Sequence, residues 1–506
     1  MVMKKVAPQC MAAAVAAGSL LAANWAFAQQ VDSAAPGDPG RTYQQSDGRD
    51  PISTDRKKKS AIQGEISGRR LPASAGRRKD SKKARNILSR RPDRDGVDRW
   101  TASTVNGETP RGGGAWLGEP RDRRVGRFFD RLRAQKAKED EDRQTAESPY
   151  ADYLAFKKSL SDEAGITYQI QPSLFTQWGW PNGGKAATQV ILSPSLNWDM
   201  FDNQWIGRGS LQVAYAYNRY QENLQNGATL AARLNVLTPI NDTPTNAYSF
   251  AQLTYTHELP GNWLQITAGQ FQFTNFDSNQ YASNQQLTFV NYALSQNGSA
   301  SYIPTSLGGY VQINPTDTLS FAGGVQDANN VTGNYIQTWT FGEGPWATFG
   351  YVQWTPSFPN LGSSQYSLLY YNQPAVTAQP LSAQGWSFNG VQNLDKNWGL
   401  FARFNTTSGA ISQIKTSVAG GFVYNDPLGR DRSDQIGVGV AWDITNKEAF
   451  AGQAVRNSET VVEAYWNYTI TKLLLVGPSF QLIIDPALHP NMGTAEVLTF
   501  RMTGLF

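Results

Sequence analysis

Apolar and polar residues alternate with a period of two along most of the chain from about residue 165 onward. In residues 211–217, every second residue is a large apolar or aromatic one, and the intervening positions are small or polar. The same pattern recurs in 436–442 and in 498–503. Because successive side chains of a β-strand point to opposite faces of the sheet, this period predicts strands with one apolar face and one small or polar face.

Sixteen such segments are separated by turn-like residues. The connections after the second, fourth, sixth, tenth and fourteenth segments are very short, whereas the long ones at 220–246, 275–304 and 327–344 all follow odd segments. Short turns at one end and long loops at the other are typical of outer-membrane barrels. We therefore predict an all-β fold, a 16-stranded antiparallel transmembrane β-barrel. Its strands are expected at 165–178, 186–201, 205–219, 247–259, 263–274, 305–315, 317–326, 345–356, 364–374, 384–394, 397–407, 412–425, 433–444, 457–470, 474–485 and 494–506.

The composition agrees with a surface that does not face water. Charged residues make up only 17% of the chain, while aromatic residues reach 12%; soluble domains usually contain about 25% charged residues. Beyond the N-terminus no stretch approaches about 18 consecutive apolar residues, which argues against transmembrane helices. The polar faces of the strands are mostly Gly, Ser, Thr, Asn and Gln, and this suits a water-filled lumen better than a soluble β-sandwich.

Residues 1–28 have the parts of a secretory signal peptide. Two early lysines precede an apolar run over about 11–23, and Ala26, Phe27 and Ala28 fit the small-x-small cleavage rule. We predict cleavage after Ala28; the alternative, an uncleaved anchor helix, has an apolar run too short to span a bilayer. The single cysteine, Cys10, lies in this segment, so the mature chain would have no disulfide, thiol nucleophile or zinc cluster.

The next segment differs from the barrel in charge. Residues 29–148 contain 28 Lys and Arg against 19 Asp and Glu, whereas 149–506 contain 15 against 22. We predict a disordered basic periplasmic segment at 29–118 and a charged helical linker at 119–163, with helices over 120–147 and 150–160. Export argues against nucleic acid as a partner. Lipid, lipopolysaccharide, cell-wall polymer or a periplasmic protein fits residues 29–148 better, and a solvated linker without a partner is the alternative.

The C-terminal third resembles the carbohydrate-selective outer-membrane porins (OprB-like). The resemblance is carried by YNDPLGRDRSDQIGVGVAW (424–442), by SETVVEAYWNYTITKLLLVGPSFQLIIDP (458–486) and by a last strand that ends in Phe506. GQFQFTNFD (269–277), GYVQWTP (350–356) and GLFARF (399–404) agree more loosely. The resemblance covers about 160–506 and implies a sixteen-stranded barrel that lets sugars diffuse across the outer membrane. The long basic extension departs from the family pattern, so no role for it is implied.

A pore that prefers sugars needs charged or amide groups that bind hydroxyls in pairs, and aromatic rings that stack on C–H faces. Arginines and carboxylates across a constriction also create a transverse field; the alternative is that charges inside the barrel satisfy one another. Tryptophans near strand ends, such as Trp205 and Trp263, are expected in an interfacial girdle. The predicted stacking ladder is Phe271, Phe273, Phe276 and Asp277, which lead into a connection able to fold inward. The residues that the alternation places on the lumen face are Arg208, Glu258, Arg403, Glu459, Glu463 and Arg501.

An enzymatic barrel is the second class of function to weigh. A hydrolase needs a histidine near a nucleophile or an acid, and the chain has only His257 and His489. The alternation places His257 on the lipid-facing side near a short turn and His489 in an external loop, so they should lie at opposite ends. No metal-ligand motif occurs, and we expect neither catalysis nor a cofactor.

We therefore predict a signal peptide at 1–28 and a Gram-negative outer-membrane porin domain at 164–506, with the basic arm in the periplasm. The expected function is passive, sugar-preferring diffusion of carbohydrates into the periplasm. The alternative is a barrel that serves polysaccharide export or envelope organisation through its N-terminal arm, and that arm is the feature that favours it.

Overall fold

The computed structural model describes residues 150–506, except 283, 359–360, 432 and 451. The predicted signal peptide, the basic segment and the helix expected at 120–147 lie outside the described residues. Among those described, no helix is both long and apolar enough to cross a membrane. The helices are α4 (Ala151–Ala164), α5 (Gly227–Leu234) and α6 (Tyr292–Ser295), with 3-10 helices η1 (Phe273–Phe276) and η2 (Lys447–Phe450). The strands are β1 (Ile166–Trp180), β2 (Ala187–Asn203), β3 (Gly207–Tyr220), β4 (Ala247–Glu258), β5 (Leu264–Gln272), β6 (Thr305–Ile313), β7 (Leu319–Asp327), β8 (Trp346–Trp354), β9 (Ser357–Phe358), β10 (Gly362–Gln373), β11 (Ala383–Asn393), β12 (Trp398–Thr407), β13 (Ile414–Asn425), β14 (Gln435–Thr445), β15 (Ser458–Thr471), β16 (Leu474–Ile484) and β17 (Thr494–Gly504).

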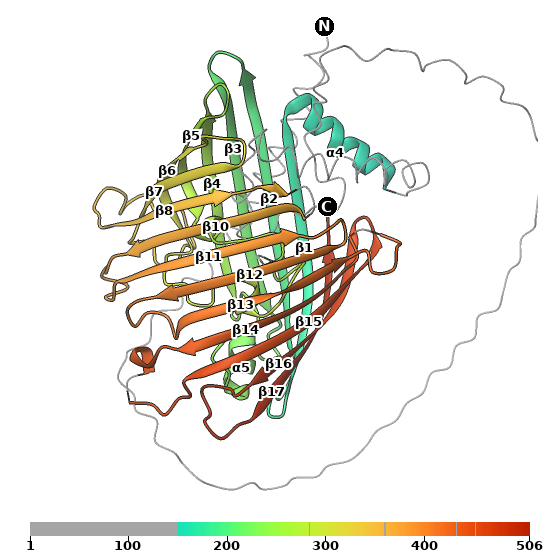
Figure 1. Ribbon diagram of the computed structural model, residues 1–506, viewed down its shortest axis with the longest axis vertical. Helices are drawn as coiled ribbons and strands as arrows, with labels where there is room; N and C mark the ends of the chain where they lie inside the picture. The colour runs from blue at the N-terminus through green and yellow to red at the C-terminus, as the bar shows by residue number, and fades with distance from the viewer. Residues whose placement is uncertain (1–149, 283, 359–360, 432, 451) are drawn as a thin grey trace, which may run out of the picture. The chain divides into compact units, whose positions relative to one another are not determined.

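The strands form a closed antiparallel barrel (Figure 1). Each long strand pairs with its neighbours in sequence, and β17 pairs with β1 through a register that matches Leu174 with Met502. Because the barrel is closed, no strand has an edge with unpaired backbone N–H and C=O groups. The interior of a bilayer offers no water to pair with such groups, so a spanning sheet must close in this way. The prediction of sixteen strands is confirmed, because the additional β9 is a two-residue pairing within the turn between β8 and β10.

Short and long connections lie at opposite ends of the barrel. The short ones include 204–206, 259–263 and 472–473, and the long ones include 221–246 and 273–304. In the turn 259–263, Gly261 and Asn262 have φ of 80° and 58°, a left-handed conformation that these two residue types adopt at low cost. This segregation is the pattern of outer-membrane barrels, in which the short turns face the periplasm.

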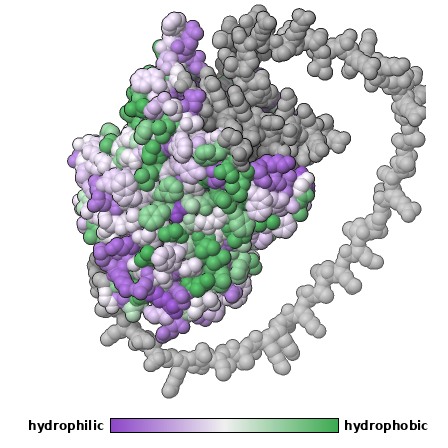
Figure 2. Space-filling view, in the orientation of Figure 1, coloured by the Kyte–Doolittle hydropathy of each residue, from purple (hydrophilic) through white to green (hydrophobic). Residues whose placement is uncertain are grey.

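The outer face of the barrel is apolar. In β17, Leu498, Phe500 and Met502 are 38–49% exposed, whereas Thr499 and Arg501 between them are fully buried. Figure 2 shows hydrophobic residues gathered over the outer side of the strands. Exposed tryptophans lie toward both ends, among them Trp205 and Trp263 at the short turns. An exposed apolar band with aromatic residues at its edges is the surface that a bilayer solvates.

The inner face carries two apolar clusters as well as polar groups. One cluster is aromatic and lies on β5, β6, β8 and β10 with the two ends of the connection 273–304. The other joins inward residues of β11 to β17, such as Phe401 and Val461, to α5 and to the middle of the same connection. Both clusters exist because two long connections, loop 221–246 and loop 273–304, fold into the barrel and cover these side chains.

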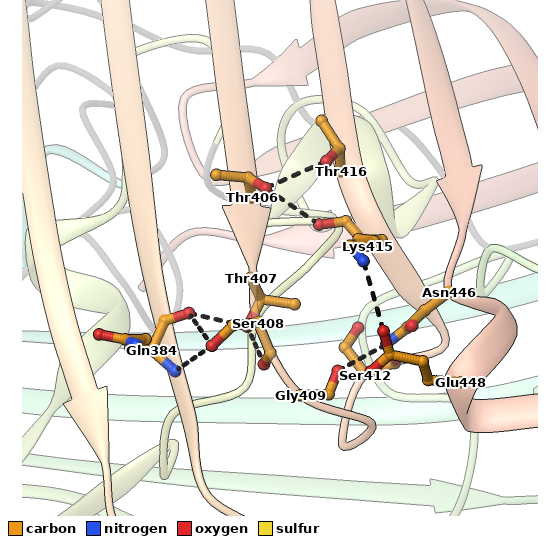
Figure 3. Close-up of polar contacts among 10 residues, drawn as sticks. All are labelled: Gln384, Thr406, Thr407, Ser408, Gly409, Ser412, Lys415, Thr416, Asn446 and Glu448. Atoms are coloured by element: carbon orange, nitrogen blue, oxygen red, sulfur yellow. Dashed lines mark hydrogen bonds and ion pairs between the residues drawn. The ribbon is translucent and has the colours of Figure 1, made fainter.

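At the end of the barrel that carries the long loops, polar contacts link the strands β11 to β14 and their connections (Figure 3). The side-chain amide of Asn446 donates to the carbonyl oxygens of Gly409 and Ser412, both at 2.8 Å, and so fixes the connection between β12 and β13. Lys415 and Glu448 form an ion pair of 3.6 Å there, with both side chains more than half exposed. An exposed pair of this kind contributes at most about 1 kcal/mol, so the buried amide of Asn446 is the stronger contact.

Candidate pore constriction

Loop 273–304 crosses the lumen from one wall of the barrel to the other. It leaves the wall after β5, and its two ends pack in the aromatic cluster on β5 to β10. Its middle reaches β1 on the opposite wall, where Gln286 Nε2 donates to Ser173 Oγ at 2.7 Å. The cross-section of the barrel is therefore narrowed by this loop, and the groups on and around it decide what can pass.

The aromatic residues of the predicted stacking ladder form the root of this loop. Phe271, Phe273 and Phe276 are at most 3% exposed. Phe273 stacks on Tyr302 at 4.8 Å between ring centroids, and Phe276 packs on Phe349 at 4.5 Å. In this arrangement the three phenylalanines join the two ends of the loop to the wall, and other protein atoms cover their faces.

Arg403 on β12 and Asp277 on the loop itself anchor the same root. Arg403 lies on the inward face, as its phase in the strand predicts, and is 2% exposed. Its guanidinium donates to Asn389 Oδ1 at 2.7 Å, to the Ala282 carbonyl oxygen at 2.6 Å and to the carbonyl oxygens of Gln296 and Asp277. The Asp277 carboxylate accepts from Asn389 Nδ2 at 3.0 Å and from the Tyr302 hydroxyl at 3.0 Å. Loop carbonyl oxygens thus surround the guanidinium, and side-chain amides and hydroxyls of the loop and of β11 surround the carboxylate.

Glu463 and Arg501 anchor the middle of the loop from β15 and β17. The Glu463 carboxylate accepts from the backbone N–H groups of Val290 and Asn291 at 2.7 and 2.8 Å, and from Ser479 Oγ at 2.6 Å. Arg501 donates to the carbonyl oxygens of Gln285 and Thr288. Both side chains are fully buried. Each charged group therefore satisfies loop backbone that leaves solvent when the loop enters the lumen.

Loop 221–246 is the second inward segment. Asn226 and Asn235 flank its helix α5, which packs Leu230 and Leu234 into the larger apolar cluster. The Glu459 carboxylate receives the backbone N–H groups of Leu237 and Thr238 at 2.8 and 3.0 Å. Glu459 thus performs for this loop the task that Glu463 performs for the other.

The two loops meet at Asp242. Its backbone N–H donates to Gln285 Oε1 at 3.0 Å, and its carboxylate accepts from Gln285 N at 3.2 Å, from Gln296 Nε2 at 3.4 Å and from Ser295 Oγ. Burial raises the pKa of the Asp242 carboxyl to about 7; hydrogen bonds from Ser295, Gln285 and Gln296 act in the lowering direction, and Glu463 adds to the rise. The ionisation of this group is therefore sensitive to pH near neutrality.

Arg208 and Glu258 lie apart from this site. They face each other in the register of β3 and β4 at the short-turn end, where Arg208 pairs with Asp199. Their direct contact with a solute remains a prediction, as it does for the other inward charges. His257 lies nearby on the outward phase of β4 and bonds to the Ile206 carbonyl oxygen at 2.9 Å, while His489 belongs to the opposite connection, between β16 and β17.

The alternation places the charged strand residues on the inner face, but it does not show that the long connection 221–246 folds into the barrel. Asp242, Gln285 and Gln296 belong to no strand and therefore have no phase from which to infer a direction. One sequence signal was present, because asparagines bracket the apolar-rich stretch GATLAARL of α5 and Asn226 caps it by accepting from Thr229 N at 2.8 Å.

A closed sixteen-stranded barrel with an apolar outer band, short turns at one end and a loop folded into its lumen defines an outer-membrane porin, a channel and not an enzyme. The chain belongs to the carbohydrate-selective porin family OprB, whose profile matches residues 185–506. It is accordingly a protein of the Gram-negative outer membrane.

Known proteins of two kinds are similar to this chain. Porin AaxA of Chlamydia abortus is 30% identical over 367 residues, which cover 70% of this chain and 81% of that protein. Porin AaxA of Chlamydia muridarum is 31% identical over 370 residues, covering 69% and 79%. A solved structure of OprB from Pseudomonas putida at high pH superposes with a TM-score of 0.58 at 18% identity, covering 70% of this chain and 97% of that one. The last similarity concerns the fold alone.

Proposed function

We propose that this porin passes carbohydrates by passive diffusion and prefers them to anionic solutes of similar size. The observation that carries the proposal is the burial of charge around the two inward loops. The inner-face charges that hold these loops are each at most 2% exposed and are occupied by protein groups. They are Asp277, Arg403, Asp443, Glu459, Glu463 and Arg501.

Groups that keep part of their surface exposed on loop 273–304 are neutral for the most part. They include Tyr292 and Gln296 on the loop itself, and Tyr351 on the facing wall is half-buried as well. Phenol and amide groups bind hydroxyls, and aromatic rings stack on the C–H faces of sugar rings. A narrow passage lined by such groups suits an uncharged, hydroxylated solute.

The burial of the anchoring charges also suggests a division of roles among the predicted pore residues. Arg403, Glu463 and Arg501 shape the passage by holding loop 273–304, and the three phenylalanines at the loop's root keep its ends on the wall. Arg208 and Glu258 remain candidates for a solute contact at the short-turn end.

Liposome swelling tests the preference. Full-length protein is reconstituted, and the influx of glucose is compared with that of gluconate, which has a similar size and one negative charge. We expect glucose to enter several-fold faster than gluconate, with protein-free liposomes as the baseline. Equal rates, or faster entry of gluconate, would contradict a preference for sugars.

A further inference from the structure

Asp242 differs from the other carboxylates around the inward loops in its access to water. Asp277, Asp443, Glu459 and Glu463 are at most 1% exposed. Asp242 keeps part of its surface exposed, although the two loops around it remove enough water from its carboxyl group to raise the pKa. Its carboxylate accepts three hydrogen bonds, from Gln285, Ser295 and Gln296. Two carboxylate oxygens offer about four acceptor positions, so the three protein donors leave about one of them for a further hydrogen bond.

The surroundings of Asp242 suit a hydroxylated solute. Gln296, which donates to it, is itself part-exposed, and so is Tyr292 one helical turn earlier in α6. The charged and titratable groups that interact electrostatically with Asp242 include Glu463 from β15, Arg403 from β12 and Tyr292 from α6. Glu463 and Arg403 are occupied by loop backbone, so neither is available to a solute.

We propose that Asp242 is the residue that sets the specificity of the constriction: its carboxylate accepts hydroxyl hydrogens of a passing sugar and gives the pore a preference for cations over anions. The first part rests on the proposed sugar-porin function, and the second does not. A fixed carboxylate in a narrow passage raises the local concentration of cations and repels anions. A carboxylate also binds hydroxyls more strongly than a neutral acceptor does.

The test uses full-length protein in planar bilayers with three forms: the natural chain, Asp242→Asn and Glu343→Gln. Glu343 is an exposed carboxylate in the connection between β7 and β8, so its variant removes the same charge away from the constriction. The reversal potential in a KCl gradient gives the cation-to-anion permeability ratio, and glucose titration gives the strength of current block. We expect Asp242→Asn to lower the ratio several-fold and to weaken block about tenfold, the equivalent of one charge-assisted hydrogen bond. Glu343→Gln should change neither.

Each outcome separates the two proposals. If no sugar blocks the natural chain but Asp242→Asn still lowers the permeability ratio, the sugar function fails and the charge role of Asp242 stands. If both readouts in Asp242→Asn equal those of the natural chain, the role of Asp242 is overturned.

Titration of the natural chain needs no variant and covers the case in which Asp242→Asn disturbs the loops. The permeability ratio should fall as the pH is lowered through about 7, where Asp242 takes up a proton. A ratio that stays flat from pH 9 down to about pH 3, which is below the ordinary pKa of an aspartate, would overturn the charge role of Asp242.

Discussion

Removing the charge of Glu463 should release the middle of loop 273–304 from β15. In Glu463→Gln the side chain keeps its shape but offers one acceptor oxygen, whereas two backbone N–H groups, of Val290 and Asn291, now share the carboxylate. One of these N–H groups would then face the amide NH2 in a buried site. A hydrogen bond to a charged group contributes about 1.5–3 kcal/mol and an unsatisfied buried donor costs about 1–3 kcal/mol. The expected loss of anchoring is therefore about 2–4 kcal/mol, which corresponds to about 30-fold to several hundred-fold in the opening equilibrium.

Amide hydrogen exchange measures this opening directly. In the variant, the N–H groups of Val290 and Asn291 should exchange faster by the factor just given, while amides of the barrel strands keep their protection. Glu496→Gln is the matched control, because Glu496 is an exposed carboxylate on β17, which β16 separates from β15. Unchanged exchange at Val290 and Asn291 in a folded Glu463→Gln barrel would refute the anchoring role of Glu463.

Three further predictions concern other parts of the chain. Phe273→Ala leaves a cavity beside Tyr302 and should cost about 3–5 kcal/mol, seen as a lower temperature of heat-induced unfolding on gels; an unchanged temperature would contradict the packing. Deleting residues 29–148 should leave assembly and conductance intact, and loss of either would show that the segment plugs or nucleates the barrel. Burial lowers the pKa of Lys157 in α4 to about 8. The folded state therefore holds this proton less tightly than the unfolded state does. The packing of α4 on Tyr168 should accordingly become more stable as the pH rises above about 8. Lys157→Met should abolish that pH dependence in hydrogen exchange of α4.

The barrel could be predicted from the sequence because its rule is local. A residue that faces lipid alternates with one that faces inward, so a short window such as 498–503 shows both the strand and the phase. The lengths of the connections then show which end of the barrel carries the short turns and which carries the long loops. The structure keeps Arg403, Glu463 and Arg501 on the inner face, where the alternation places them.

The constriction could be predicted only in part, because phase tells which way a side chain points and not what meets it there. Glu463 and its partner Val290 are 173 positions apart, and the sequence around either residue does not indicate that the two are in contact. The long connection at 220–246 is predicted, but not that it folds into the barrel or that Asp242 contacts the other loop, because loop residues have no period. Arg501 illustrates the result: it points inward, but loop carbonyl oxygens surround its guanidinium in place of the lumen water that the polar strand faces suggest.

Single-channel current in the presence of sugar tests the sugar-preferring porin most directly. With full-length protein in a planar bilayer, ion current through one channel should fall as glucose or a short oligosaccharide is added, because a sugar held at the constriction excludes ions while it stays. The reduction should saturate with sugar concentration. A current that no sugar reduces, together with selectivity for a simple anion, would contradict the sugar-porin function.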